Sequence, residues 1–104
     1  MFIVKGVNVF PSQVETVLME IPEVDKNYLI VLDRAEERDV ITVQTEVRKE
    51  HFTGEIMRLH NLQEKIRNRL KDVILVNPVV ELVEPGTLPP STGKAQRVVD
   101  RRSL

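Results

Sequence analysis

The chain has 104 residues, which is enough for one hydrophobic core and too few for two, so a single domain is predicted. Apolar residues make up 41% of the chain and charged residues 30%, the composition of a globular protein, and a formal net charge of -1 gives no overall attraction to nucleic acid or to an anionic membrane. The absence of cysteine excludes disulfides, thiolate zinc sites and cysteine nucleophiles.

The chain is predicted to begin with a strand and a helix. Residues 1–10 are rich in β-branched and aromatic side chains, and Gly6 and Asn8 within them suit a turn or a bulge. A helix is predicted from Pro11, because proline suits the first helical turn and apolar residues follow at helical spacing until Pro22.

A β-hairpin is predicted next, after a polar connection over residues 23–27. Residues 28–32 form a short apolar run typical of a buried strand, and residues 33–38 form a charged turn. Over residues 40–47, apolar side chains and threonine alternate with polar side chains, the period of a strand with one buried face. The two strands are expected to pair antiparallel.

The second half of the chain is predicted to hold a long helix, a bent strand and a tail. The apolar face of this helix is formed by residues that step by three or four: Phe52, Ile56, Leu59, Leu62, Ile66 and Leu70. Residues 73–83 are predicted to be extended and to bend at Asn77 and Pro78, because proline cannot donate to a sheet ladder. Residues 84–104, with three prolines and two glycines, are predicted to form a loop with a short strand around residues 96–99.

The predicted elements follow the order β-α-β-β-α-β. The predicted fold class is therefore α+β, with two layers related to the ferredoxin-like plan, followed by the C-terminal loop and short strand. Regulatory small-molecule-binding domains of the ACT kind share this order, so the fold alone does not decide the function.

Lys94 is the first candidate for chemistry. It belongs to the run Ser-Thr-Gly-Lys-Ala over residues 91–95, where a loop can hold an ammonium group against an anionic ligand. The run resembles part of a phosphate-binding P-loop, but Gly86 lies seven residues before Gly93 instead of five, and Ala95 replaces the magnesium-binding hydroxyl. The P-loop is therefore rejected, and residue chemistry alone favours an ordinary solvated lysine.

Two blocks at opposite ends of the chain resemble motifs of the phenylacetate-CoA ligase family. The block that follows the hinge in these ligases is similar to residues 3–15, which read Ile-Val-Lys-Gly-Val-Asn-Val-Phe-Pro-Ser-Gln-Val-Glu. Their terminal lysine motif is similar to residues 86–98, which read Gly-Thr-Leu-Pro-Pro-Ser-Thr-Gly-Lys-Ala-Gln-Arg-Val, although Pro90 stands where many relatives carry a basic residue. The resemblance identifies residues 1–104 as a single C-terminal lid domain of an adenylate-forming ligase, whose N-terminal nucleotide-binding domain is absent.

The resemblance implies two reactions served by one lid. The carboxylate of phenylacetate or a related aryl acid attacks the α-phosphate of ATP, giving an acyl-adenylate and pyrophosphate, and the thiol of coenzyme A (CoA) then displaces AMP. Lys94 would be catalytic in the first reaction, with Gly93 beside it in the lysine loop. The second reaction would use a tunnel for the pantetheine arm of CoA, flanked by Lys5, Gly6, Val7 and Asn8.

The resemblance also implies the partners of the domain. ATP and CoA are expected as co-substrates, Mg²⁺ is expected to bind through the missing domain, and that N-terminal domain is the expected protein partner. A cytoplasmic location is expected, because the apolar runs are far shorter than the ~20 residues of a membrane-spanning helix and the amino terminus lacks a signal-peptide pattern. No membrane or nucleic-acid partner is expected, and a homodimer is compatible with the sequence.

Two other functions compete with the ligase interpretation. An ACT-like regulatory domain would not require the Gly-Lys-Ala run of residues 93–95 on its tail, so this run favours the ligase. A nucleic-acid-binding ferredoxin-like domain would use an aromatic platform, whereas this chain has one Tyr and three Phe.

Other polar residues favour structural interpretations. His51 and His60 lie nine residues apart with no matching carboxylate cluster, so no metal site is predicted. A cluster of basic residues near the end of the long helix has a helix-dipole rationale that competes with binding of CoA phosphates: Arg67, Arg69 and Lys71.

Overall fold

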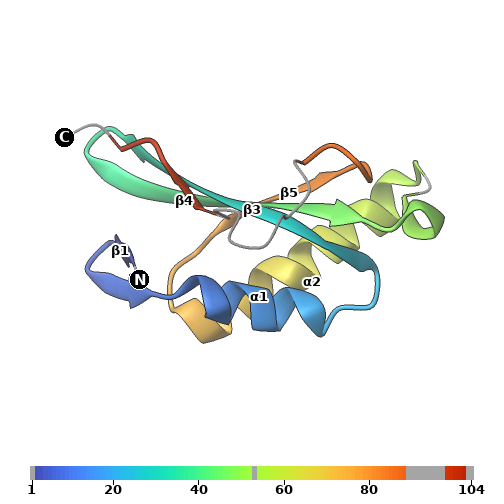
Figure 1. The fold of residues 1–104 in the computed structure, drawn as a ribbon, viewed down its shortest axis with the longest axis horizontal. Helices are drawn as coiled ribbons and strands as arrows, with labels where there is room; N and C mark the ends of the chain where they lie inside the picture. Colours follow the sequence, from blue (N-terminus) through green and yellow to red (C-terminus); the bar gives the residue numbers. More distant parts are fainter. Residues whose placement is uncertain (1, 53, 89–97, 103–104) are drawn as a thin grey trace.

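The computed structural model describes residues 2–52, 54–88 and 98–102, which form two layers. Helices α1 (Pro11–Met19) and α2 (Ile56–Ile74) lie together on one face of a four-stranded sheet (Figure 1). The strands of this sheet are β3 (Val24–Ala35), β4 (Arg38–Val47), β5 (Val79–Val83) and β6 (Val98–Asp100). The predicted two-layer α+β class is confirmed.

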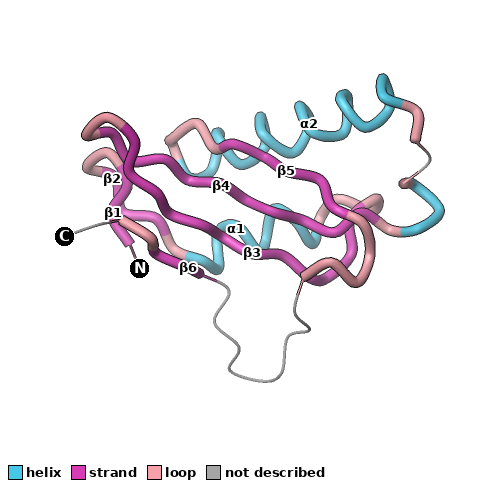
Figure 2. The backbone as a smooth tube through the Cα atoms, turned by 90° about the horizontal axis from the view of Figure 1, so that it is seen from above, coloured by secondary structure: helices cyan, strands magenta, loops and turns pink. Residues whose placement is uncertain are grey.

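The sheet has the strand order β5-β4-β3-β6 (Figure 2). Strands β3 and β4 pair antiparallel as the sequence predicted, whereas β5 is parallel to β4 and β6 is parallel to β3. Parallel neighbours need a long crossover, and α2 provides it between β4 and β5. The crossover holds α2 against the sheet.

Residues 1–10 were predicted to form one β segment with a turn or a bulge. In the structure this segment is extended on both sides of the turn, but it is not part of the four-stranded sheet. It forms a separate antiparallel hairpin of β1 (Phe2–Val4) and β2 (Val7–Val9), in which Val4 pairs with Val7. Its turn consists of Lys5 and Gly6, whose φ angles of 51° and 78° are both positive, as in the turns that match the twist of a two-residue hairpin. The predicted turn at Gly6 is confirmed, whereas Asn8 lies within β2, and the segment counted as one strand is a hairpin because Lys5 and Gly6 reverse the chain.

Strand β3 is longer than predicted at both ends. Residues 23–27 were predicted to be a polar connection, but β3 begins at Val24 and has a register shift between Val24 and Tyr28. The charged turn contains only Glu36 and Glu37, both with positive φ, because the flanking polar residues keep their strand pairing while their side chains project into solvent.

The long helix is displaced toward the C-terminus relative to its prediction. It begins at Ile56, after the short 3₁₀ helix η1 (Lys49–His51), and continues to Ile74, where Leu75 takes a left-handed conformation. Residues 73 and 74 were predicted to be extended. They remain helical because Ile74 is four residues after Leu70 and continues the buried stripe.

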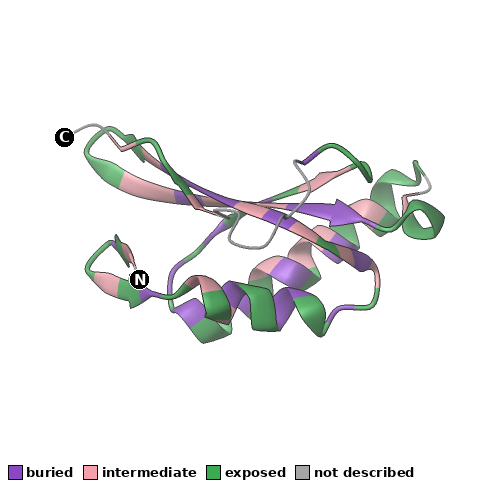
Figure 3. Cartoon of the chain, viewed as in Figure 1, coloured by how far each residue is buried: buried purple, intermediate pink, exposed green. Residues whose placement is uncertain are grey.

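The core fills the space between the helices and the sheet. Figure 3 shows buried residues in both layers. The predicted alternation in β4 is confirmed on its inward face, where the buried side chains are Ile41, Val43, Thr45 and Val47. Fully burying one aliphatic side chain stabilises a domain by about 1.5–3 kcal/mol, so this core holds the sheet as a rigid platform for the loops at its ends.

Candidate functional site

The tunnel residues predicted from the sequence lie in and beside the β1–β2 turn. Lys5, Gly6 and Asn8 are exposed, whereas Val7 packs against the core. A Cβ atom at Gly6 would meet no atom within 4 Å, so the φ of 78° is what requires glycine within this domain. The space above the turn is open to a ligand or to another domain.

Asp39, at the start of β4, anchors this turn to the main sheet. Its Oδ2 accepts a hydrogen bond from the backbone N–H of Lys5 at 3.2 Å, and its Oδ1 accepts one from Nε of Arg34 at 3.2 Å. Nη1 of Arg102 lies 3.3 Å from Oδ2. The Lys5 N–H and the two arginines lower the pKa of Asp39, so the carboxylate stays ionised and holds the turn.

Arg102 ties the same hairpin to the last strand of the sheet. Its Nη1 donates to the carbonyl oxygen of Ile3 at 2.6 Å, while its Nε and Nη2 bind the two oxygens of Asp100 at 3.0 and 2.9 Å. These hydrogen bonds lower the pKa of Asp100 to about 2 and raise the pKa of Arg102. The hairpin, β4 and β6 are thus joined through the guanidinium group of Arg102, whose side chain is only 14% exposed.

A groove of about 550 Å³ opens beside the turn. It is lined by Lys5, Arg34, Glu37, Arg38 and Asp39. Three cationic side chains face two carboxylates, one of which is neutralised by its ion pair with Arg34. The balance of charge in the groove favours an anionic ligand.

Glu46, near the other end of β4, anchors a second loop. Its Oε1 accepts a hydrogen bond from the backbone N–H of Gly86 at 3.0 Å, and its Oε2 accepts one from Leu88 at 2.9 Å. The side-chain amide of Asn27 lies 3.5 Å from Oε1. Leu88 is itself buried, so the chain over residues 84–88 is fixed against the sheet.

Lys94 and Gly93 lie outside the described residues, as do residues 96 and 97 of the predicted short strand. The described part of that strand, β6, begins at Val98 and pairs with β3. Of the lysine motif, the structure describes residues 86–88 and Val98, so the described chain before Lys94 ends at Leu88, six residues earlier.

The two anchors are far apart on one strand. Asp39 and Glu46 are separated by seven residues of β4, roughly 23 Å at about 3.3 Å per residue. The hairpin turn and residues 86–88 at the start of the lysine motif are therefore held at different ends of the sheet. The described residues do not combine them in a single pocket.

Sequence reasoning missed the two anchoring carboxylates and Arg102. Asp39 stands beside a charged turn that gave it no distinct signal, and Glu46 occupies the same outward series as Thr42 and Gln44. No local pattern marks Glu46 as buried, because its cover comes from residues about forty positions later in the chain.

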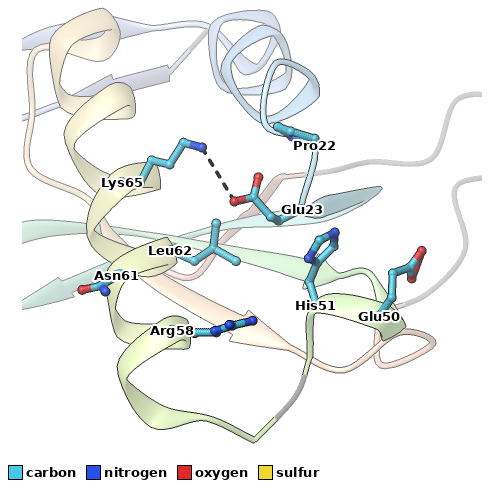
Figure 4. A pocket seen from close by; sticks show the side chains of 8 residues that line it. All are labelled: Pro22, Glu23, Glu50, His51, Arg58, Asn61, Leu62 and Lys65. Carbon is cyan, nitrogen blue, oxygen red and sulfur yellow. Dashed lines mark ion pairs between the residues drawn. The ribbon is translucent and has the colours of Figure 1, made fainter.

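A further groove, of about 600 Å³, lies between the N-terminal part of α2 and η1 (Figure 4). It is lined by Pro22, Glu23, Glu50, His51, Arg58, Asn61, Leu62 and Lys65. Nζ of Lys65 and Oε2 of Glu23 form an ion pair at 3.7 Å, which partly neutralises the groove. None of the tunnel residues lines it.

The basic residues of α2 have structural partners. Arg67 pairs with Glu64 at 2.7 Å, and Nη2 of Arg69 lies 4.0 Å from Oε2 of Glu20 on α1. Lys71 lies in the last turn of α2, where a cation interacts favourably with the helix dipole. These contacts support the structural interpretation of the cluster.

No helix among the described residues is long and apolar enough to cross a membrane. Within the same residues, no group of three or more His, Cys, Asp or Glu side chains is arranged to hold a metal ion.

Residues 6–102 match the sequence family described as the AMP-binding enzyme C-terminal domain. The chain is 40% identical to the phenylacetate-coenzyme A ligase of Thermus thermophilus, over 98% of this chain and 26% of that ligase. It is 46% identical to a crystallised domain of a phenylacetate-coenzyme A ligase from Bacteroides vulgatus, with a TM-score of 0.89 over 99% of this chain and 93% of that one.

A more distant relative has been solved in several states, including one for each reaction step. The chain is 27% identical to 2-hydroxyisobutyryl-CoA ligase in complex with 2-HIB-AMP and CoA in the thioesterification state, with a TM-score of 0.91 over 98% of this chain and 21% of that one. The chain is 26% identical to the same ligase in the postadenylation state, with a TM-score of 0.84 over 96% of this chain and 21% of that one. The relatives named here are ligases, which favours the ligase interpretation over the ACT-like alternative.

Proposed function

This chain belongs to the family of AMP-binding enzyme C-terminal domains, and on that premise we propose that it is the lid of a phenylacetate-CoA ligase. The observation that carries the proposal is the match of nearly the whole chain to ligases of this kind. The chain spans about a quarter of the length of these curated relatives. The proposal therefore assigns the binding of ATP, of the aryl acid and of Mg²⁺ mainly to the N-terminal domain of the same ligase.

In the proposed first reaction, Lys94 acts on the acid and ATP. A carboxylate oxygen of the acid attacks the α-phosphorus, the bond from that phosphorus to pyrophosphate breaks, and an acyl-adenylate forms. The ammonium group of Lys94 would hold the carboxylate and the α-phosphate in line and offset the negative charge that develops between them.

In the proposed second reaction, the β1–β2 turn lines the path of CoA. The CoA sulfur attacks the acyl carbonyl carbon, the bond to AMP breaks, and the thioester forms. Lys5, Gly6, Val7 and Asn8 would flank the pantetheine arm, and the cationic groove beside the turn suits an anionic co-substrate such as CoA. The thioesterification and postadenylation states of 2-hydroxyisobutyryl-CoA ligase support a lid that serves two steps.

The cellular location and the oligomeric state of the ligase are also open to proposal. Both ATP and CoA are substrates available in the cytoplasm, to which the proposal assigns the ligase. A homodimer stays a prediction from the sequence.

The function is tested in a full-length ligase that carries this domain with Lys94→Ala. Loss of an electrostatic clamp should slow pyrophosphate release in the absence of CoA by about 10²-fold or more. Lys94→Arg is the matched control for charge, and it should recover only part of the rate because a planar guanidinium group replaces a compact ammonium group. Wild-type pyrophosphate release by Lys94→Ala would contradict the proposed role of Lys94.

A further inference from the structure

Glu46 is a buried carboxylate on the face of the sheet opposite the helices. Its strand neighbours Thr45 and Val47 face inward, and successive side chains of a strand point to opposite faces. Glu46 nevertheless is only 2% exposed. Residues 84–88 provide its cover, since Gly86 and Leu88 both bind its side chain.

The contacts of Glu46 form a two-point clamp on the backbone. Each carboxylate oxygen accepts one amide hydrogen bond, Oε1 from Gly86 at 3.0 Å and Oε2 from Leu88 at 2.9 Å. Hydrogen bonds to an ionised acceptor are stronger than neutral ones, and two bonds two residues apart fix both the position and the direction of the chain. Gly86, with a φ of 84°, supplies the bend that turns both amides toward one side chain.

Packing of the sheet does not require a carboxylate at this position. Glu46 is opposite Val83 in the parallel pairing of β4 and β5, where an apolar pair would serve the sheet equally well. Replacing buried ionic groups by well-packed apolar ones is often neutral or stabilising. The two hydrogen bonds therefore fix the direction of the backbone over residues 86–88, which apolar packing alone would not fix.

We propose that Glu46 is a positioning residue for adenylation, which fixes residues 86–88 at the start of the lysine motif and so sets the point on the sheet from which the chain continues toward Lys94. The inference rests on the proposed function of Lys94, which follows Leu88 by six residues. Misplacement of a reacting group by about 1 Å can cost a reaction roughly 10²-fold, so a loosened departure point should affect the first reaction selectively.

The first test is Glu46→Gln in the full-length ligase. The amide has the shape of the carboxylate but only one acceptor oxygen, so it can bind one of the two backbone N–H groups. Pyrophosphate release without CoA should fall by about tenfold or more, in kcat rather than in the KM for ATP. Thioester formation from preformed acyl-adenylate should stay within about twofold of the wild-type rate, because this step does not use Lys94 in the proposed mechanism.

Glu81→Gln is the matched control. Glu81 lies on β5, is exposed, and accepts a hydrogen bond from Gln44 at 3.0 Å. Glu81→Gln also removes one negative charge from the sheet, but away from residues 86–88. The rates of both reactions should therefore stay unchanged.

The second test measures the clamp itself by amide hydrogen exchange in the 104-residue chain. In Glu46→Gln, the amides of Gly86 and Leu88 should exchange about tenfold faster or more, while the amide of Ile66 in α2 keeps its rate. Unchanged exchange at Gly86 and Leu88 would overturn the clamp.

The outcomes separate this inference from the proposed function. Equal losses in both reactions of Glu46→Gln, or unchanged pyrophosphate release while Lys94→Ala loses it, would overturn the positioning role and leave the function of Lys94 standing. Wild-type pyrophosphate release in both variants would instead overturn the function proposed for Lys94, and the positioning role with it.

Discussion

At the start of β4, Asp39 lies between two arginines with its side chain 16% exposed, whereas Glu46 near the end of the strand is buried beneath residues 84–88. Asp39 holds the N-terminal hairpin through the backbone amide of Lys5, and it also binds the guanidinium groups of Arg34 and Arg102. Glu46 holds residues 86–88 through the two backbone amides of Gly86 and Leu88, and the side-chain amide of Asn27 on β3 lies 3.5 Å from Oε1.

The difference shows that one strand can anchor two loops whose attachment depends differently on salt and on pH. The network around Asp39 is partly exposed, through Arg34 and Asp100, so it is screened by salt and weakened by acid. A buried carboxylate bound by neutral donors is shielded from salt, but its removal leaves amides without partners. The two loops proposed to serve different reactions are therefore expected to respond differently to the same perturbation.

The largest expected effect is that of Glu46→Ala on stability. The variant leaves the amides of Gly86 and Leu88 without their acceptor and opens a cavity, so the free energy of unfolding should fall by about 3 kcal/mol. Urea denaturation of the 104-residue chain measures this change. In the control Glu81→Ala, on an exposed part of β5, the free energy of unfolding should stay within about 0.5 kcal/mol of the wild-type value. A similarly small change in Glu46→Ala would contradict the difference between the two anchors.

A smaller effect is expected for Asp39→Asn, and it should depend on salt. The variant loses the charge that attracts Arg34 and Arg102, so the urea midpoint should fall at low ionic strength. The difference from wild type should shrink between roughly 0.1 M and 1 M salt, as the screening length falls from about 10 Å to about 3 Å. Glu46→Ala is the comparison, because its deficit should be the same at both salt concentrations.

The smallest expected effect is the acid response of the hairpin anchor. The pKa of Asp100 is lowered to about 2 by its hydrogen bonds to Arg102, and the pKa of Asp39 is lowered first by the amide of Lys5. Because the folded pKa values lie below the ordinary aspartate value of 3.8, the stabilisation is present above pH 3.8 and is lost as the pH falls through the folded pKa values. Carboxyl titration by NMR should give a midpoint for Asp100 near 2. A midpoint near 3.8 would show that the network with Arg102 does not persist in solution.

Periodic apolar patterns predicted most of the fold. The stripe through Leu62, Ile66 and Leu70 identified α2, and the alternation over residues 40–47 identified the inward face of β4. Both patterns arise from burial against a single partner surface, so they are visible within the sequence of one element.

Features that depend on distant segments were not predictable in this way. The reversal at Lys5 and Gly6 uses a pair less typical of hairpin turns than Asn-Gly, so the sequence left open whether Gly6 marks a turn or a bulge. The burial of Glu46 depends on residues 86–88, and the role of Arg102 depends on the distant residue Ile3. The motifs that resembled a ligase family identified the domain, but they contained neither anchor.

The division of labour between the two ends of the chain is the central claim, and a crossed pair of variants in the full-length ligase tests it. Lys94→Ala removes the charge proposed for adenylation. Gly6→Asn adds a side chain at the proposed CoA tunnel, and asparagine tolerates the positive φ of the turn better than a branched or bulky residue does.

The measurement is the rate of each half-reaction in each variant: pyrophosphate release without CoA, and thioester formation from preformed acyl-adenylate. Lys94→Ala should lose about 10²-fold or more in the first rate and keep the second, while Gly6→Asn should keep the first rate and lose about tenfold in the second. Equal losses of both rates in both variants would contradict the account, and would indicate that each substitution only loosens the domain.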